Sequence, residues 1–208
     1  MPVTYDKSFN SHPINADEKK RLGCKTEILE KYDSGMKDMF NRHSKVLQVR
    51  FDLRYPQDGS VVPIPEHIHD FNYNLKRSLS RKKVAGGHDV DPQLIWAREQ
   101  KDSEHPHYHH LLLANGNAVR DYYPIVQKAE ELWSRTIGSD QPGLVHYCDK
   151  SSNGVPNKNG IMVRKGHAAE SEQIDKCYHQ ASYLAKERDK DRKVKGVWTC
   201  GSSRVKSK

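Results

Sequence analysis

The residues with the clearest chemistry form the run HYHH at positions 107–110. In a strand, successive side chains point to opposite faces, so His107 and His109 share one face. Two imidazoles about 7 Å apart on a pleated surface can bind the same divalent ion. His67 and His69 have the same spacing, but they follow Pro65 in a helical pattern, where side chains two residues apart diverge. We therefore predict a metal site at the first pair and none at the second.

A carboxylate lies where it could complete that site. Glu99 ends a strand predicted for residues 93–99, which we expect to pair antiparallel with the histidine strand across the polar connection 100–106. A third protein ligand there would leave coordination positions open for substrate oxygens. Two simpler interpretations stay open: the histidines are ordinary surface residues, and Glu99 is a solvated carboxylate at a strand end.

Tyr183 and Lys186 are candidates for nucleophilic chemistry. They are three residues apart on a predicted helix and therefore share a face. A phenol is a weak nucleophile at neutral pH, and a nearby cation would help it to attack a phosphate. Tyr178 is a rival, but it points about 140° away round the helix, so only one of the two tyrosines can face the metal site. In the alternative interpretation, Tyr183 packs on the core and Lys186 extends to solvent.

The charge distribution favours a polyanionic partner. The net charge is +8, and residues 186–208 hold nine Lys and Arg against three Asp and Glu, a net charge of +6. Binding of such a surface to nucleic acid is driven by counterion release. The candidate contacts are Arg50, Arg54, Lys190, Arg192 and Lys193.

The periodicity predicts an α+β fold. Helices are expected at 16–40, after Pro65, at 122–137 and at 171–186; strands are expected at 45–55, 93–99, 107–114, 143–148 and 160–164, with an edge strand near 196–200. This order suggests an antiparallel sheet with helices packed mainly on one face, which would leave the other face for substrate. We divide the chain into an N-terminal helical extension (1–44), a catalytic domain (45–203) and a basic tail (204–208).

Several classes of protein are disfavoured. No run reaches the roughly 18 apolar residues of a membrane helix, so no membrane partner is expected. The four cysteines are far apart in the sequence, which argues against a zinc ribbon or a disulfide framework and favours the cytoplasm. The chain also lacks a nucleotide-binding loop of the GxxxxGK type.

Three blocks together resemble the HUH endonucleases, in particular the replication initiators of filamentous phages (the gene-two product family of inoviruses) and their prophage relatives. The strand VRFDLRYP at 49–56 is similar to the first motif of that family, HYHHLLL at 107–113 to its histidine motif, and SYLAK at 182–186 to its tyrosine motif. The blocks occur in the order of the family. Residues 96–99, Asn115 and residues 143–146 add to the resemblance.

The resemblance implies a ferredoxin-like or RRM-like core that nicks and rejoins single-stranded DNA to start rolling-circle replication. It implies Mg²⁺ or Mn²⁺ as cofactor, with His107, His109 and Glu99 as ligands. Tyr183 would form a transient 5′-phosphotyrosyl link, assisted by Lys186. The partners would be a single-stranded origin and the helicase and polymerase of the host.

Two other functions stay open on the sequence alone. The chain could be a phage protein that binds or regulates single-stranded nucleic acid and has lost catalysis. The histidine site could also be a structural or hydrolytic zinc centre.

Overall fold

The computed structural model describes residues 1–82, 84, 86–100, 103–150, 154–187 and 197–204. Its centre is a six-stranded antiparallel sheet with the order β10-β6-β7-β5-β8, in which β9 also pairs with β5. The strands are β5 (Lys45–Leu53), β6 (Gln93–Glu99), β7 (His107–Asn115), β8 (Val145–His146), β9 (Ile161–Arg164) and β10 (Cys200–Ser202). The predicted α+β class, the antiparallel sheet and the edge strand near residue 200 are confirmed.

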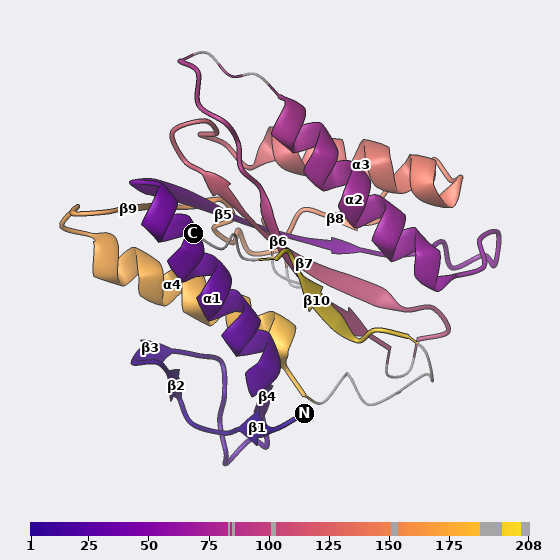
Figure 1. Cartoon of the computed structure of the whole chain (residues 1–208). Coiled ribbons are helices and arrows are strands. Elements are labelled where there is room, and N and C mark those ends of the chain that lie inside the picture. Colours follow the sequence, from indigo (N-terminus) through magenta and orange to yellow (C-terminus); the bar gives the residue numbers. More distant parts are fainter. Residues whose placement is uncertain (83, 85, 101–102, 151–153, 188–196, 205–208) are drawn as a thin grey trace.

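Four helices cover the sheet, and they lie on both of its faces (Figure 1). The helices α2 (Pro65–Arg81) and α3 (Tyr123–Ile137) pack on one face, and α1 (Thr26–Arg42) and α4 (Glu170–Ala185) pack on the other. Each pair of helices encloses a hydrophobic core of its own. The expectation that the helices lie mainly on one face and leave the other open was therefore wrong in this detail.

A buried polar residue explains the error. Gln48 is on the face of β5 that alternation marks as polar, yet it is fully buried. Tyr32 of α1 donates a hydrogen bond of 2.7 Å to Gln48 Oε1, and Gln48 Nε2 donates one of 3.1 Å to the Cys177 carbonyl of α4. A polar side chain can be buried when its hydrogen bonds are satisfied, so a polar strand face need not be an open face.

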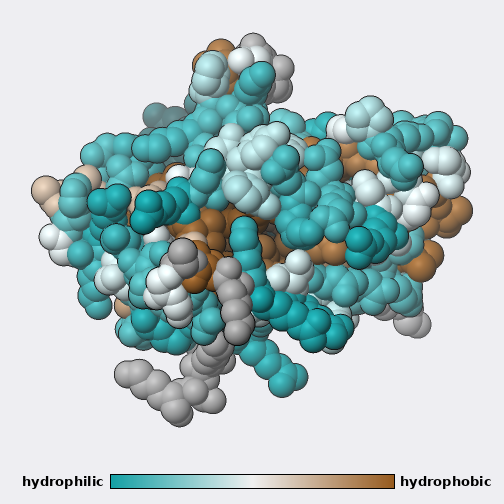
Figure 2. Space-filling view, turned by 90° about the horizontal axis from the view of Figure 1, so that it is seen from above, coloured by the Kyte–Doolittle hydropathy of each residue, from teal (hydrophilic) through white to brown (hydrophobic). Residues whose placement is uncertain are grey.

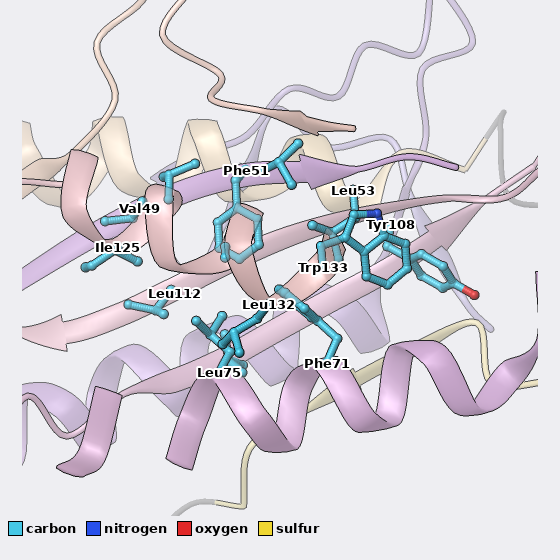
Figure 3. Packing of buried hydrophobic residues seen from close by; sticks show 14 of the residues in the cluster. Val49, Phe51, Leu53, Phe71, Leu75, Tyr108, Leu112, Ile125, Leu132 and Trp133 are labelled. Carbon is cyan, nitrogen blue, oxygen red and sulfur yellow. The ribbon is translucent and has the colours of Figure 1, made fainter. Parts of the chain in front are cut away.

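The core under α2 and α3 is aromatic (Figure 3). Phe51 projects from β5 toward Phe71 of α2, and Trp133 of α3 packs against Phe71 with ring centroids 5.6 Å apart. The Trp133 indole N–H donates a 2.7 Å hydrogen bond to the Arg54 carbonyl just beyond β5. These contacts fix the end of β5 that carries the charged residues of the candidate site.

The N-terminal segment differs from the prediction. The helix begins at Thr26 rather than near residue 16. Before it, β1 (Val3–Thr4) pairs with β4 (Cys24–Lys25), and β2 (Ser8–Phe9) pairs with β3 (His12–Pro13). A Cβ on Gly23 would lie 2.5 Å from a Val3 side-chain carbon, so this close approach requires glycine. The chain turns here instead of continuing a helix.

The face of the molecule that Figure 2 shows is mostly hydrophilic. Figure 2 looks down on the molecule from above the view of Figure 1, and hydrophobic residues show there mainly in a hollow near the middle. Within the described residues, no helix is both long enough and apolar enough to cross a membrane. Of the predicted nucleic-acid contacts, Lys190, Arg192 and Lys193 lie outside the described residues.

Candidate active site

Strand register brings the predicted metal ligands to one place. Glu99 at the end of β6 lies opposite His107 at the start of β7. His109, two residues further along β7, lies opposite Asp52 of β5. The side chains at these positions point to the same face of the sheet, the face that α4 covers. Residues from three strands therefore meet at one end of the sheet.

His109 is held between two carboxylates. Its Nδ1 lies 2.8 Å from Asp52 Oδ1, and its Nε2 lies 2.7 Å from Glu99 Oε2. Metal-binding histidines generally donate their second ring N–H to a carboxylate, which fixes the ring, and Asp52 provides that partner. Two ligands at right angles on an octahedral Mg²⁺ or Mn²⁺ ion are about 3.0 Å apart, so Nε2 and the Glu99 oxygen are spaced to share one ion. The donor set fits the predicted cofactor.

His107 suits the role of a second ligand. It is half-buried, and burial together with the neighbouring Arg54 guanidinium lowers its pKa, although Glu99 and Asp52 act in the opposite direction. A lowered pKa keeps the imidazole neutral near pH 7, and only the neutral ring can bind a metal ion.

Asp52 is the electrostatic centre of the group. Burial would raise the pKa of its carboxyl, but His109 and Arg50 outweigh burial and hold that pKa well below its usual range. Arg50 Nη2 lies 3.2 Å from Asp52 Oδ2. The carboxylate is therefore charged at neutral pH and orients a histidine and an arginine at once.

Tyr183 faces this group from α4. Its ring centroid is 5.6 Å from that of His109, in an edge-to-face arrangement. The Arg50 guanidinium carbon lies 3.8 Å from the centroid of the Tyr183 ring, and Lys186 Nζ lies 3.7 Å from it. Two cations therefore lie against one aromatic ring, where they could stabilise the negative charge of a phosphate bound beside it.

Tyr178 has a structural role instead. It is 3% exposed, and its hydroxyl donates a 2.5 Å hydrogen bond to Asp33 Oδ1 of α1. Its ring stacks on His12 at a centroid distance of 4.2 Å. Burial and the Asp33 carboxylate both raise the pKa of Tyr178, which makes it a poor nucleophile. Tyr183 is thus the tyrosine of α4 that faces the histidines.

A groove of about 800 Å³ runs beside Tyr183, between α4 and the β5–β8 end of the sheet. Arg50, Asp52, Arg54 and Tyr183 line one part of it. The rest of the lining is mixed: it includes Lys150, Lys158 and Lys176, but also the acidic residues Glu172 and Asp175, and Lys176 is ion-paired with Glu172. Two of the predicted nucleic-acid contacts, Arg50 and Arg54, therefore border the groove.

Comparison with known proteins assigns the family. The sequence family described as the YagK/YfjJ C-terminal domain matches residues 4–202. The chain belongs to the YagK/YfjJ C-terminal domain family. The match extends along the chain from β1 to β10, so it includes every described residue of the candidate site. No curated protein sequence matches the chain.

Among solved structures, the catalytic domain of the Adeno Associated Virus type 5 Rep protein is similar to this chain. The similarity covers 59% of this chain and 76% of that one, at 12% sequence identity and a TM-score of 0.34.

The YagK/YfjJ domain also contains site residues that the sequence did not reveal. Asp52, His146 and Cys148 each offer a donor atom, and the three atoms lie within 4.8 Å of one another, so this group could hold a metal ion. Asn159 binds the β5 backbone as a neighbouring strand would: its Oδ1 accepts from the Arg50 N–H at 3.0 Å, and its Nδ2 donates to the Arg50 carbonyl at 2.7 Å. Asp52 and His146 lie within blocks of the sequence resemblance but were not predicted as ligands, and Cys148 and Asn159 lie in none of these blocks; the four come together only through pairing with β5 and the loop after β8.

Proposed function

We propose that the chain is a metal-dependent tyrosine endonuclease of the HUH type, which nicks and rejoins single-stranded DNA to start rolling-circle replication of a phage or prophage genome. One observation carries the proposal: the Tyr183 ring lies 5.6 Å from the His109 ring and against two cations, in a groove open to substrate.

The reaction is a transesterification. The Tyr183 oxygen loses its proton and attacks the phosphorus of a DNA phosphodiester, forming a tyrosyl phosphate at the 5′ end. The bond from phosphorus to the 3′ oxygen breaks, and that oxygen takes up a proton to become a free 3′-hydroxyl. Arg50 and Lys186 stabilise the negative charge that grows on the phosphate, and because the energy of the phosphodiester is kept in the new bond, the step can be reversed to rejoin the strand.

His107, His109 and Glu99 would hold Mg²⁺ or Mn²⁺. When bound, the ion would polarise the phosphate and make it more electrophilic. Asp52 would position the His109 ring, because its Oδ1 lies 2.8 Å from the ring Nδ1. The ring then presents Nε2 toward Glu99, whose oxygen lies 2.7 Å away.

The groove suits a single strand of nucleic acid. Its cations Arg54, Lys150 and Lys158 can contact phosphates, and such contacts do not depend on base sequence. We extend the proposed contact surface to the basic residues Lys190, Arg192 and Lys193, which follow α4 in the sequence. The natural substrate would be a single-stranded origin. A polymerase of the bacterial host, acting together with a host helicase, would extend the free 3′-hydroxyl.

The test is covalent capture of DNA. The purified chain is incubated with Mn²⁺ and 5′- or 3′-labelled single strands from the intergenic region of its own phage or prophage, and adducts are resolved on a denaturing gel. We expect a metal-dependent adduct that carries the DNA 3′ to the nick and disappears in Tyr183→Phe. Tyr178→Phe is the matched control, because it removes a phenol from the same helix but outside the site, and it should still form the adduct.

A different result would favour the alternative function. If the chain binds single strands in a salt-sensitive manner but forms no adduct with any divalent metal, and if binding survives the double substitution His107→Ala and His109→Ala, it is a binding or regulatory protein without catalysis.

A further inference from the structure

A second group of donor atoms lies beside the histidine site and includes a thiol. Cys148 Sγ is 3.4 Å from His146 Nδ1, and the same nitrogen is 3.9 Å from Asp52 Oδ2. Asp52 contributes its other oxygen, Oδ1, to His109. One carboxylate therefore borders two groups of possible ligands, one on each of its oxygens.

The spacing of this group matches a tetrahedral ion. With zinc–sulfur bonds of about 2.3 Å and zinc–nitrogen or zinc–oxygen bonds of about 2.0–2.1 Å, tetrahedral ligands are about 3.4–3.6 Å apart. The observed separations of 3.4 and 3.9 Å are within about half an ångström of these values. A small rotation of the His146 side chain, which is 39% exposed, would close the longer one.

The position is both reachable and constrained. Asp52, His146 and Cys148 all line the groove of about 800 Å³, so an ion can enter from solvent. Cys148 has a backbone φ of +53°, a left-handed conformation that residues with a side chain rarely adopt. This conformation leaves the otherwise buried thiol directed at His146, to whose Nδ1 and carbonyl oxygen it is close.

We propose that Asp52, His146 and Cys148 form a second cation site, selective for zinc and other thiophilic divalent ions, beside the histidine site. The thiol loses its proton to solvent as the ion binds, and the thiolate becomes the ligand. Thiolate and imidazole ligands favour Zn²⁺, whereas Mg²⁺ prefers oxygen ligands and is excluded. Three protein ligands leave a fourth position for water or for an oxygen of the substrate.

Occupation of this site would act on the tyrosine through Arg50. Arg50 Nη2 contacts Asp52 Oδ2 at 3.2 Å, the same oxygen that faces His146. A divalent ion on that oxygen repels the guanidinium and takes away its partner. Since Arg50 also lies 3.8 Å from the centre of the Tyr183 ring, its displacement removes one of the two cations at the proposed nucleophile. Zinc is therefore expected to inhibit nicking, and this consequence alone rests on the proposed function.

The binding test uses Co²⁺ as a spectroscopic probe for zinc. Metal-free full-length protein is titrated with Co²⁺ under reducing conditions, and the thiolate-to-cobalt charge-transfer band is followed in the near ultraviolet. We expect the band to saturate at one equivalent, to disappear when Zn²⁺ is added and to be absent in Cys148→Ser. His107→Ala is the matched control, because it disables the histidine site but leaves these three donors, and it should keep the band.

A second variant guards against misfolding of the first. His146 is half-exposed, so His146→Gln should fold, and it should weaken Co²⁺ binding at least tenfold. The proposal is wrong if the wild type gives no thiolate band, or if Cys148→Ser or His146→Gln binds Co²⁺ as tightly as the wild type. The band is measured without DNA, so it tests the second cation site independently of nicking. A failure to nick would count against the proposed function only.

The inhibitory effect is measured separately. Each variant is assayed for Mn²⁺-supported nicking relative to its own rate without zinc. The zinc concentration for half-inhibition should rise at least tenfold in Cys148→Ser. Equal inhibition of the two proteins would overturn the link through Arg50.

Discussion

His110 should make the stability of the protein depend on pH. It is next to His109 in the sequence but is not part of the candidate site. It points to the opposite face of β7 from His109 and is fully buried in the aromatic core. Its ring stacks on Phe51 with centroids 5.0 Å apart, and its Nε2 lies 3.0 Å from Asn72 Oδ1. Burial lowers the pKa of His110 to about 3. The ring is therefore neutral in the folded protein at any pH above that value.

The magnitude follows from linkage. In the unfolded chain His110 has a pKa of about 6.5 and takes up a proton as the pH falls below that value, whereas the folded chain does not. Protonation therefore favours the unfolded state between pH 6.5 and pH 3, and stability is lost as the pH falls through this window. At 1.36 kcal/mol per pKa unit the full loss is about 5 kcal/mol, of which about 2 kcal/mol falls between pH 7 and pH 5.

Urea unfolding at pH 7 and pH 5 measures this effect. Other groups titrate in the same range, so the comparison is with His110→Phe, which keeps an aromatic ring between Phe51 and Phe71 and cannot be protonated. The wild type should lose about 2 kcal/mol more of its free energy of unfolding than the variant does. If both proteins lose the same amount, or if NMR shows a charged His110 ring at pH 5, the assignment of a neutral buried imidazole is wrong.

Three further substitutions test the site and its support. Lys186→Ala should lower the nicking rate about 100-fold with little change in DNA affinity, because it removes one of two cations at the Tyr183 ring; single-turnover kinetics would show it. Asp52→Asn should weaken Mn²⁺ binding 10- to 100-fold by loosening the His109 ring, and calorimetry would contradict this with an unchanged affinity. Tyr32→Phe should cost about 1–3 kcal/mol of stability, because Gln48 loses a buried hydrogen-bond donor; an unchanged urea midpoint would count against that cost.

The part of the site that could be predicted depended on spacing within single elements. Alternation along β7 places His107 and His109 on one face, and helical periodicity places Tyr183 and Lys186 together at the end of α4. Both follow from fixed backbone repeats, so they hold whatever the rest of the chain does. The strand pair β6 and β7 was also predictable, because strands joined by a polar connection of hairpin length usually pair antiparallel.

The prediction that helices cover mainly one face of the sheet was wrong. The alternation of β5 marks a polar face, but it does not reveal that Tyr32 and the Cys177 carbonyl satisfy Gln48 there. Hydrogen-bond partners from α1 and α4 convert a polar strand face into an interior one. The pattern predicts which residues share a face, whereas the partners that decide burial come from distant parts of the chain.

By itself, the sequence determined the helices and strands from residue 45 onward, the antiparallel order of β6 and β7 and the pairing of two histidines with one candidate tyrosine. Only the tertiary structure decided that Asp52 lies between His109 and His146, that Arg50 lies against Tyr183, and that Cys148 joins the group. The physical reason is that backbone repeats act over a few residues, whereas strand register and loop packing join residues about a hundred positions apart. The chemistry proposed for this chain depends on both.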